Sequence, residues 1–315
     1  MKIAFHDNCL SVRGTTVAIF NYAYWTRNYL NIEPIIVYNK SLFTNDNYGL
    51  TKCSSEFSVF GYDSPKQIDN ILSNQKCDAL FAIKGGKYDG VISNNIKNLI
   101  CAVSSNCSKD DIHGDIFAMG SDWLSKITGI PSVPHIVHLP NNNLDMRDEL
   151  GIPKDALVFG RNGGWDTFDL PFVKQTIIES LEKRNDIWFV FQYTEPFYSH
   201  ERIIYLNPTA DLIEKTKFIN TCDVMLHARY IGESFGLSCA EFSIRNKPVI
   251  TWYNSPERNH IETLGEKGIY YENEKDIKYI LLNLDKKEIN GLEWNCYQEY
   301  SPEKVIKKFE EVYLK

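Results

Sequence analysis

Arg229-Tyr-Ile-Gly-Glu-Ser-Phe-Gly-Leu-Ser-Cys-Ala-Glu-Phe-Ser-Ile-Arg-Asn-Lys-Pro-Val-Ile250 is the stretch that decides the fold, because it sets two carboxylates around a predicted helix start. Glu233 precedes that start and Glu241 follows it. A helix N-terminus offers unpaired N–H groups and the positive end of the helix dipole, so an anion such as a diphosphate can bind there. The flanking carboxylates can accept hydrogen bonds from hydroxyls. The pattern therefore favours a ligand that carries both phosphates and sugars, a nucleotide-sugar.

The same stretch resembles the Glu-x7-Glu signature of the retaining glycosyltransferases of family four. Glu233-Ser-Phe-Gly-Leu237 and Lys247-Pro-Val-Ile250 occupy, without a gap, the places of that family's Phe-Gly-Leu and Pro-Val-Ile runs. Asn246 stands where the family usually has Gly, and Asn is the next best residue for a left-handed helix end. The alternative interpretation is that the two acids lie on the solvated face of an amphipathic helix. Phe235 and Gly236 favour the ligand site, because a glycine there allows the backbone to approach a ligand closely.

Composition limits the classes of protein that the chain can belong to. The 315 residues are 43% hydrophobic and 24% charged, with a formal net charge of -7. This length suits two domains, and the charge provides no overall basic field, so we expect no nucleic-acid partner. The eight cysteines form no Cys-x-x-Cys pair and have no histidine at zinc spacing, so we expect no metal and a reducing compartment.

The first residues contain a short strand with no long apolar segment behind it, and no window is apolar enough to cross a bilayer. We therefore expect a cytoplasmic protein without a signal peptide. Peripheral membrane contact stays open.

Apolar runs of strand length alternate with stretches of helical period, which predicts an α/β architecture with largely parallel sheets. The resemblance implies the GT-B fold, two Rossmann-like domains with a cleft between them. We expect an N-terminal acceptor domain at residues 1–150, a nucleotide-sugar donor domain at 151–295, and a C-terminal helix at 296–315 that crosses back to the first domain. The expected strands are residues 3–5, 35–38, 79–83, 99–103, 157–159, 187–191, 202–205, 224–226 and 248–252.

Ligands of open parallel sheets bind beyond the carboxyl ends of the strands, so the loops after strands are candidate sites. The loop 160–166 follows the first strand of the donor domain, and its Arg161 matches the Arg of the family's Gly-Arg pair. The family's Lys a few residues later is missing, and the nearest candidate is Lys174. An arginine alone can hold a diphosphate bidentately, here with help from the N–H groups of Gly163 and Gly164.

The loop 11–16 follows the first strand of the chain. In the resembled family the matching glycine-containing loop approaches the donor phosphates and the acceptor, which implies this role for Gly14 and Thr15. The local alternative is that Thr15 or Thr16 caps the following helix, with Gly14 as a turn residue.

Three further positions are candidates. Lys84 opens Lys84-Gly-Gly-Lys-Tyr-Asp89, which predicts either an anion-binding nest or a plain polar turn. His113 lies in the region where some relatives have a histidine that touches the donor sugar, although a lone histidine is more often structural. Asn207 follows a strand at the place where the resemblance implies backbone contact with the nucleotide base.

The resulting hypothesis is a retaining glycosyltransferase that moves a sugar from a nucleotide diphosphate to a hydroxyl of a glycan or other acceptor. The resemblance implies that Glu233 holds hydroxyls of the donor sugar and Glu241 those of the ribose. Arg161 and the helix start would neutralise the leaving phosphate. The helix start is formed by Ser234, Phe235, Gly236 and Leu237. No Asp-x-Asp motif has a convincing context, so neither a metal nor a cofactor besides the donor is expected.

Three alternatives remain at this point. A glycoside hydrolase would use Glu233 and Glu241 as acid and nucleophile but would leave Arg161 unused. A GT-B-fold epimerase or phosphorylase shares the fold. A non-catalytic nucleotide-sugar or carbohydrate-binding module fits the missing second cation.

Overall fold

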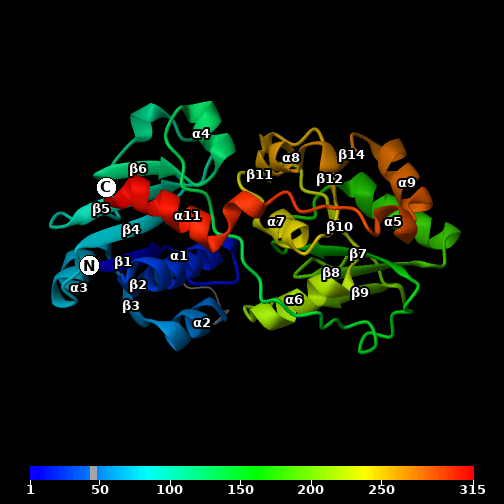
Figure 1. Cartoon of the computed structure of the whole chain (residues 1–315), viewed down its shortest axis with the longest axis horizontal. Coiled ribbons are helices and arrows are strands. Elements are labelled where there is room, and N and C mark those ends of the chain that lie inside the picture. Colours follow the sequence, from blue (N-terminus) through cyan, green and yellow to red (C-terminus); the bar gives the residue numbers. More distant parts are fainter. Residues whose placement is uncertain (43–47) are drawn as a thin grey trace. The chain divides into compact units, whose positions relative to one another are not determined.

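The computed structural model describes residues 1–42 and 48–315 and divides the chain into two compact units (Figure 1). Unit 1 comprises Met1–Ile136 and Glu299–Lys315, and unit 2 comprises Val137–Gln298. The first boundary lies before the expected residue 150, because the intervening segment binds to unit 2. Within it, Arg147 forms an ion pair with Asp223 at 2.7 Å.

Unit 1 is built on six parallel strands in the order β3-β2-β1-β4-β5-β6. The strands are β1 (Lys2–Asp7), β2 (Glu33–Asn39), β3 (Ser58–Tyr62), β4 (Ala79–Lys84), β5 (Lys97–Ala102) and β6 (Ile116–Met119). The helices are α1 (Gly14–Leu30), α2 (Tyr48–Glu56), α3 (Ile68–Asn74), α4 (Asp122–Thr128) and α11 (Pro302–Phe309). A strand order of 3-2-1-4-5-6 with crossover helices is that of a Rossmann-like domain.

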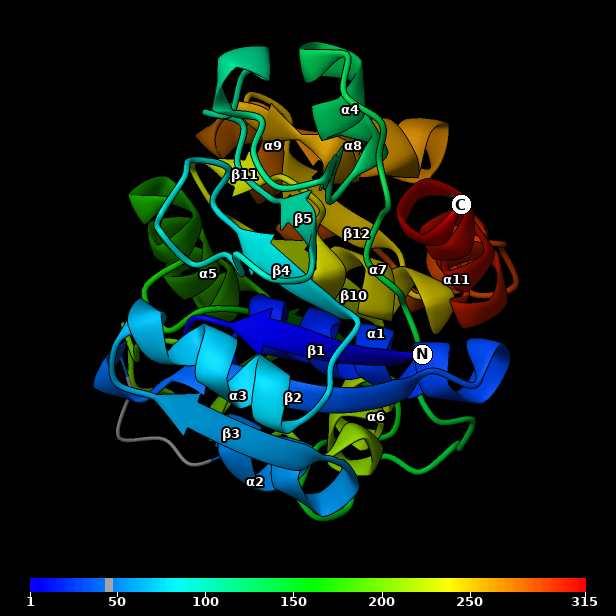
Figure 2. The same ribbon diagram turned by 90° about the vertical axis from the view of Figure 1, so that its left-hand side faces the viewer.

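Both faces of the unit 1 sheet are covered, as the near-continuous apolar strands require. Ile68 and Leu72 of α3 pack on the face that carries Ala4 and Leu80. In Figure 2, α3 lies in front of these strands and α1 behind them. On the α1 face, the C-terminal segment joins the core, since the rings of Phe309 and Tyr313 have centroids 5.3 and 5.4 Å from that of Phe81.

Unit 2 repeats this topology with a second sheet of six parallel strands, in the order β14-β12-β10-β7-β8-β9. Counted along the chain, this is again 3-2-1-4-5-6. The strands are β7 (Leu157–Asn162), β8 (Ile187–Gln192), β9 (Ile203–Leu206), β10 (Val224–His227), β12 (Val249–Trp252) and β14 (Ile269–Tyr271). A separate two-stranded pair consists of β11 (Gly232–Glu233) and β13 (Glu257–Arg258). The helices are α5 (Pro171–Lys183), α6 (Leu212–Thr221), α7 (Leu237–Ile244), α8 (Asn259–Leu264), α9 (Glu274–Asn283) and α10 (Lys286–Ile289).

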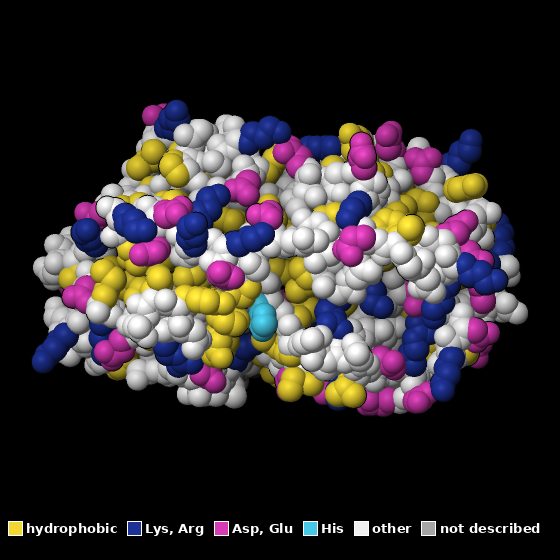
Figure 3. Space-filling model, viewed as in Figure 1, with side chains coloured by type: hydrophobic (Ala, Val, Ile, Leu, Met, Phe, Trp, Pro, Cys, Tyr) yellow, Lys and Arg dark blue, Asp and Glu magenta, His cyan; other side chains and the backbone are white. Residues whose placement is uncertain are grey.

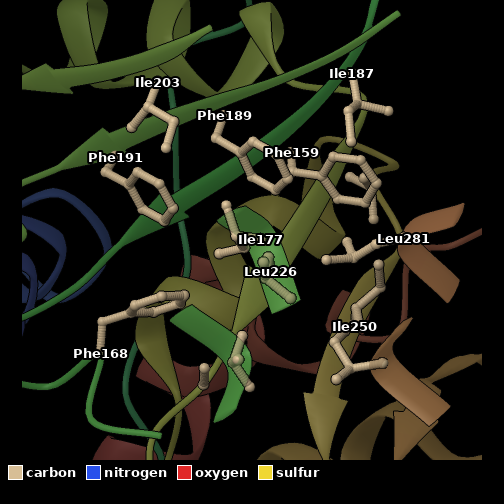
Figure 4. Packing of buried hydrophobic residues seen from close by; sticks show 14 of the residues in the cluster. Phe159, Phe168, Ile177, Ile187, Phe189, Phe191, Ile203, Leu226, Ile250 and Leu281 are labelled. Atoms are coloured by element: carbon tan, nitrogen blue, oxygen red, sulfur yellow. The ribbon is translucent and has the colours of Figure 1, made fainter. Parts of the chain in front are cut away.

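The core of unit 2 is rich in aromatic side chains. Phe159, Phe189 and Phe191 lie on adjacent strands and stack at 5.1 and 6.2 Å between ring centroids (Figure 4). Ile177 of α5 and Leu281 of α9 belong to the same buried cluster. Full burial of one such side chain stabilises the fold by about 1.5–3 kcal/mol, so the cluster holds the central strands in place.

Every strand that the sequence predicts is present, and the α/β class with two Rossmann-like sheets is confirmed. The ladder strands that the sequence analysis missed are β3, β6 and β14. All three lie at sheet edges, and β6 and β14 have only four and three residues. Such short runs carry too little apolar pattern to be recognised without their neighbours.

The helix at the centre of the opening stretch begins and ends at residues of positive φ. Gly236 is the N-cap of α7 with φ of 86°, and a Cβ at this position would lie 3.3 Å from Cβ of Glu233. Asn246 has φ of 56°, so the predicted left-handed helix end is confirmed. Its side chain accepts from the N–H of Trp294 at 2.7 Å and donates to the Leu292 carbonyl at 2.9 Å.

The surface carries charges of both signs. On the face drawn in Figure 3, lysines and arginines are interspersed with aspartates and glutamates, without a large area of one sign. Among the described residues, no helix is both long and apolar enough to span a membrane.

Candidate functional site

Charged side chains gather at the carboxyl edge of the unit 2 sheet. β7 and β10 are neighbours at the centre of this sheet, and they end at Asn162 and His227. This is the point where the strand order reverses, which is the usual ligand site of open α/β sheets. The short strand β11 then brings Glu233 to the same edge, as its contact with His227 shows.

Glu233 is held by one partner on each carboxylate oxygen. Nε2 of His227 lies 3.2 Å from Oε1, and Nη1 of Arg229 lies 3.1 Å from Oε2. Burial opposes ionisation here, but the hydrogen bond with His227 and the charge of Arg229 outweigh it and lower the pKa of Glu233 to about 2. Glu233 is therefore a fixed carboxylate at neutral pH. Its side chain remains 22% exposed, which leaves room for a further donor from a ligand.

A line of buried polar groups continues behind Glu233. Nδ1 of His227 lies 2.8 Å from Oγ1 of Thr251, which lies 3.0 Å from Nε2 of His260. Burial lowers the pKa of His260 to about 3, so this ring is neutral at neutral pH. One neutral tautomer of His227 satisfies all these contacts: Nε2–H donates to Glu233, Nδ1 accepts from the Thr251 hydroxyl, and that hydroxyl accepts from His260. The orientation of Glu233 is thus fixed from the core.

Glu241 faces a cation that the sequence analysis missed. Nζ of Lys215, on α6, lies 2.9 Å from Oε1 of Glu241, and Nδ2 of Asn162 donates to Oε2 at 3.4 Å. The two charged side chains are 9% and 3% exposed. A signal existed in the sequence, because Lys215 shares the helical stripe of the buried Phe218 and Ile219.

Arg161 lies at the end of β7, as predicted, but its guanidinium is engaged with the protein. Nη1 donates to the Tyr193 carbonyl at 3.1 Å and to the Thr194 hydroxyl, and Nη2 donates to the Gly164 carbonyl at 2.9 Å and to Oγ1 of Thr167 at 2.6 Å. The residue is 3% exposed, and burial lowers its pKa to about 10. Arg161 therefore organises the loop after β7.

Gly163 and Gly164, in the loop after β7, lie beside the buried guanidinium of Arg161 or the residues that bind it. A Cβ at Gly163 would lie 2.5 Å from Nη2 of Arg161, so the buried guanidinium requires glycine there. A Cβ at Gly164 would lie 3.1 Å from Cγ2 of Thr167, which is a tight contact but not a prohibitive one. The expected binding of a diphosphate by these N–H groups stays a prediction.

The start of α7 carries the remaining predicted residues of unit 2. Ser234, Phe235 and Gly236 connect β11 to α7, and Leu237 is the first helical residue. The N-cap residue is Gly236, which has no side chain that could cap this helix N-terminus. The ring of Phe235 is 4% exposed and packs against Tyr297, so its side chain belongs to the core rather than to a binding surface.

Asn207 directly follows β9, so it lies at the carboxyl edge of the same sheet. β9 is separated from β7 by one strand, β8. Its predicted contact with a base is not tested by the geometry. The described residues contain no group of three or more histidine, cysteine, aspartate or glutamate side chains arranged to hold a metal ion.

Four predicted residues lie in unit 1. Gly14 and Thr15 begin α1, whose N-cap is Arg13 without a side-chain cap. The alternative in which Thr15 or Thr16 caps the helix is therefore wrong. The Thr16 hydroxyl instead donates to Oδ2 of Asp7 at 2.5 Å. A Cβ at Gly14 would meet nothing within 4 Å among the described residues, so the space beside this residue is open.

Lys84 is buried, with a side chain 1% exposed, and its ammonium donates to Asp89 and to the Val91 carbonyl. It holds the loop after β4, so the expectation of an anion-binding lysine is corrected in this conformation. Nδ1–H of His113 donates to the Asp111 carbonyl at 2.8 Å, and the ring packs edge-on against Tyr88. These contacts account for a structural role, and contact with a donor sugar stays a prediction.

Comparison with known proteins finds similar structures but no similar sequences. No protein-family model matches the chain, and no curated protein sequence matches it. Among solved structures, HepE of Anabaena in complex with UDP and glucose superposes with a TM-score of 0.68 at 12% identity, over 99% of this chain and 98% of that one. A glycosyltransferase from Rickettsia africae gives a TM-score of 0.67 at 12% identity, with coverage of 99% and 97%.

A UDP-N-acetylglucosamine 2-epimerase is also similar, with a TM-score of 0.60 at 12% identity and coverage of 99% and 96%. The superpositions on glycosyltransferases and on the epimerase each cover nearly all of this chain, and so include both units. Together with the two 3-2-1-4-5-6 sheets, these similarities establish that the chain has the GT-B fold, with two Rossmann-like domains.

Proposed function

We propose that the protein is a retaining glycosyltransferase that uses a nucleoside diphosphate sugar as its donor. The observation that carries this proposal is the ionised Glu233, which His227 and Arg229 hold beside the start of α7, whose N-cap is Gly236. A fixed carboxylate suits sugar hydroxyls, and a helix N-terminus with nearby arginines suits phosphates. The GT-B fold and the glycosyltransferases that share it support the same reaction class.

The proposed reaction transfers the sugar without a protein nucleophile. The bond between the anomeric carbon and the diphosphate oxygen breaks, and the acceptor oxygen bonds to the same carbon on the same face. The acceptor proton passes to the leaving diphosphate, which departs as the nucleoside diphosphate. The protein supplies charge stabilisation that is already in place when negative charge develops, and such stabilisation accounts for most of the rate enhancement in many enzymes. No metal ion is part of the proposal.

Glu233 holds donor hydroxyls in this scheme. The ribose contact expected of Glu241 stays a prediction, because its side chain is 3% exposed and is bound by Lys215. Both roles need carboxylates. The low pKa of Glu233 argues against glycoside hydrolysis, which requires one of the two acids to be protonated at working pH. Glu241 is bound to Lys215 and is equally unsuited to that role.

UDP-sugars are the first donors to test, because HepE was crystallised with UDP-glucose. The assay measures release of UDP from a panel of UDP-sugars, with and without simple glycoside acceptors. We expect slow release in water and faster release with the right acceptor. Failure of the wild type to bind or turn over any nucleotide-sugar would overturn the proposal.

Epimerisation is the second candidate, because a 2-epimerase shares the fold over the whole chain. It predicts conversion of a UDP-sugar to its epimer in the absence of any acceptor. Chromatography of the products separates the two reactions, since only transfer yields a new glycoside. Binding of a UDP-sugar without either product would favour a non-catalytic module.

A further inference from the structure

We propose that Arg229 is the cation that binds the diphosphate of the donor, and that Glu233 holds it in place for this purpose. The inference rests on the proposed function and deepens it. It also supplies the second cation that the loop after β7 lacks, because no lysine follows Arg161 there.

Three cations of unit 2 lie around the two glutamates, and they differ in how many of their hydrogen-bond donors are bound by protein groups. Arg161 is 3% exposed, and its two terminal nitrogens donate to four neutral protein oxygens. The side chain of Lys215 is 9% exposed and is bound by Glu241. The side chain of Arg229 is 31% exposed. Within the described part of the chain, Glu233 is the one ion-pair partner of its guanidinium.

The orientation of that contact leaves the phosphate-binding edge of Arg229 unoccupied. Glu233 forms its ion pair with Nη1, at 3.1 Å from Oε2. The opposite edge consists of Nε and Nη2, whose N–H groups point the same way and match two oxygens of a phosphate. Nε is buried and has no hydrogen-bond partner among the described residues. A buried donor without an acceptor is costly, so an acceptor supplied by a ligand would stabilise this arrangement.

Arg229 also lies close to the other features that favour an anion. Glu233, its ion-pair partner, lies against the N-cap of α7, since a Cβ on Gly236 would be 3.3 Å from that of Glu233. Arg161 is close enough for the charges of both Glu233 and Arg229 to act on its pKa. Two arginines and one carboxylate leave one net positive charge beside a helix N-terminus, which suits a diphosphate better than a neutral sugar.

In this arrangement Glu233 fixes the position of the Arg229 guanidinium. Its other oxygen is bound by His227, which Thr251 and His260 orient from the core. Arg229 is thereby held in one position before the ligand arrives, so little side-chain entropy is lost on binding.

The test compares UDP with uridine, because the two differ only in the diphosphate. We expect Arg229→Gln to weaken UDP binding by about 10- to 100-fold in calorimetric titration, with uridine affinity unchanged. Arg229→Lys keeps the charge but loses the fork, so we expect an intermediate loss. Lys183→Gln is the matched control: it removes an exposed cation at the end of α5, and we expect no change for either ligand.

Unchanged UDP affinity in Arg229→Gln, with normal binding by the wild type, would overturn the inference and leave the proposed function standing. An equal loss of UDP and uridine affinity would also overturn it, because that result indicates a general structural effect. Absence of nucleotide binding by the wild type would overturn both. If Arg229→Gln does not fold, the UDP-to-uridine ratio of Arg229→Lys decides: an unchanged ratio contradicts the inference.

Discussion

The two sheets have the same strand order, but the side chains at equivalent strand ends are held differently. In unit 1, β1 and β4 end at Asp7 and Lys84, and both groups are buried and bonded within the unit. In unit 2, the equivalent strand β7 ends near Arg161, which is bonded to its own loop, and β10 ends at His227, which contacts the partly exposed Glu233. One topology thus provides the same position for buried polar groups in one unit and for the support of a partly exposed carboxylate in the other.

The carboxyl groups of Asp7 in unit 1 and Glu233 in unit 2 differ in the direction of their pKa shifts. Burial raises the pKa of Asp7 to about 6, because no cation among the described residues pairs directly with it, whereas the partners of Glu233 lower its pKa to about 2. Nearby cations favour the ionised form of a carboxyl group, and burial without a paired cation favours the protonated form. Four experiments address this contrast.

The largest effect is expected at Glu233. Glu233→Ala removes the carboxylate that holds the donor and Arg229, so we expect transfer to fall by at least about 1,000-fold, a cost of roughly 4 kcal/mol in the barrier. The measurement is the initial rate of UDP release with acceptor present. Circular dichroism checks that the fold is intact, and the exposed Glu266→Ala is the control. A fully active Glu233→Ala enzyme would remove Glu233 from the site.

The buried pair behind the site gives the second effect. Lys215→Met leaves Glu241 buried without its cation, and we expect the free energy of unfolding to fall by about 3 kcal/mol. Replacing both partners, in Lys215→Met/Glu241→Gln, should recover most of that loss.

Urea unfolding measures both variants. The matched control is Lys217→Met on the same helix, whose pair with Glu214 is partly exposed, so we expect only a small loss of stability. Equal losses for the two lysine variants would contradict the role assigned to Lys215.

The pH dependence of stability gives a smaller effect of opposite sign in the two units. Asp7 has a folded-state pKa above its ordinary 3.8, so the folded chain keeps a proton that the unfolded chain has released. Stability should therefore fall as pH rises from about 4 to 6, by roughly 2–3 kcal/mol. Asp7→Asn should remove this slope.

For Glu233 the sign is reversed, because its folded-state pKa lies below its ordinary 4.5. Its contribution is present above that value and is lost as pH falls towards 2. Urea titrations of wild type, Asp7→Asn and Glu233→Gln across about pH 2–7 measure both slopes. An unchanged slope between about pH 4 and 6 in Asp7→Asn would refute the assignment to Asp7.

The smallest effect concerns Gly14 at the start of α1. A Cβ there would meet open space, so Gly14→Ala should stabilise the fold by about 0.5 kcal/mol through a less flexible unfolded chain. If the backbone at Gly14 approaches a ligand, as the resemblance implies, the same change should raise KM. Thermal unfolding and steady-state kinetics separate the two effects. A stabilised enzyme with unchanged kinetics would show that Gly14 serves the fold alone.

The sequence by itself determined the features that depend on neighbours along the chain. Apolar runs and helical periods predict the main strands, and Gly236 and Asn246 mark the limits of α7 because both adopt positive φ. Glu233 and Glu241 could be singled out because both lie on one short, continuous stretch around a single helix start. The edge strands β3, β6 and β14 were missed because their short sequences depend on the neighbouring strand for stability.

Only the tertiary structure decided which charges meet. Lys215 and Glu241 are separated by 26 positions, and Arg161 and Thr194 by 33, so no local pattern links them. Arg161 was predicted to face a ligand, but its donors are taken by carbonyls and hydroxyls from neighbouring loops. Arg229 is the first residue of the opening stretch, but its sequence position does not show which of its nitrogens are paired. The structure shows that Glu233 is paired with Nη1 and that Nε has no hydrogen-bond partner among the described residues, because folding fixes which groups surround each nitrogen.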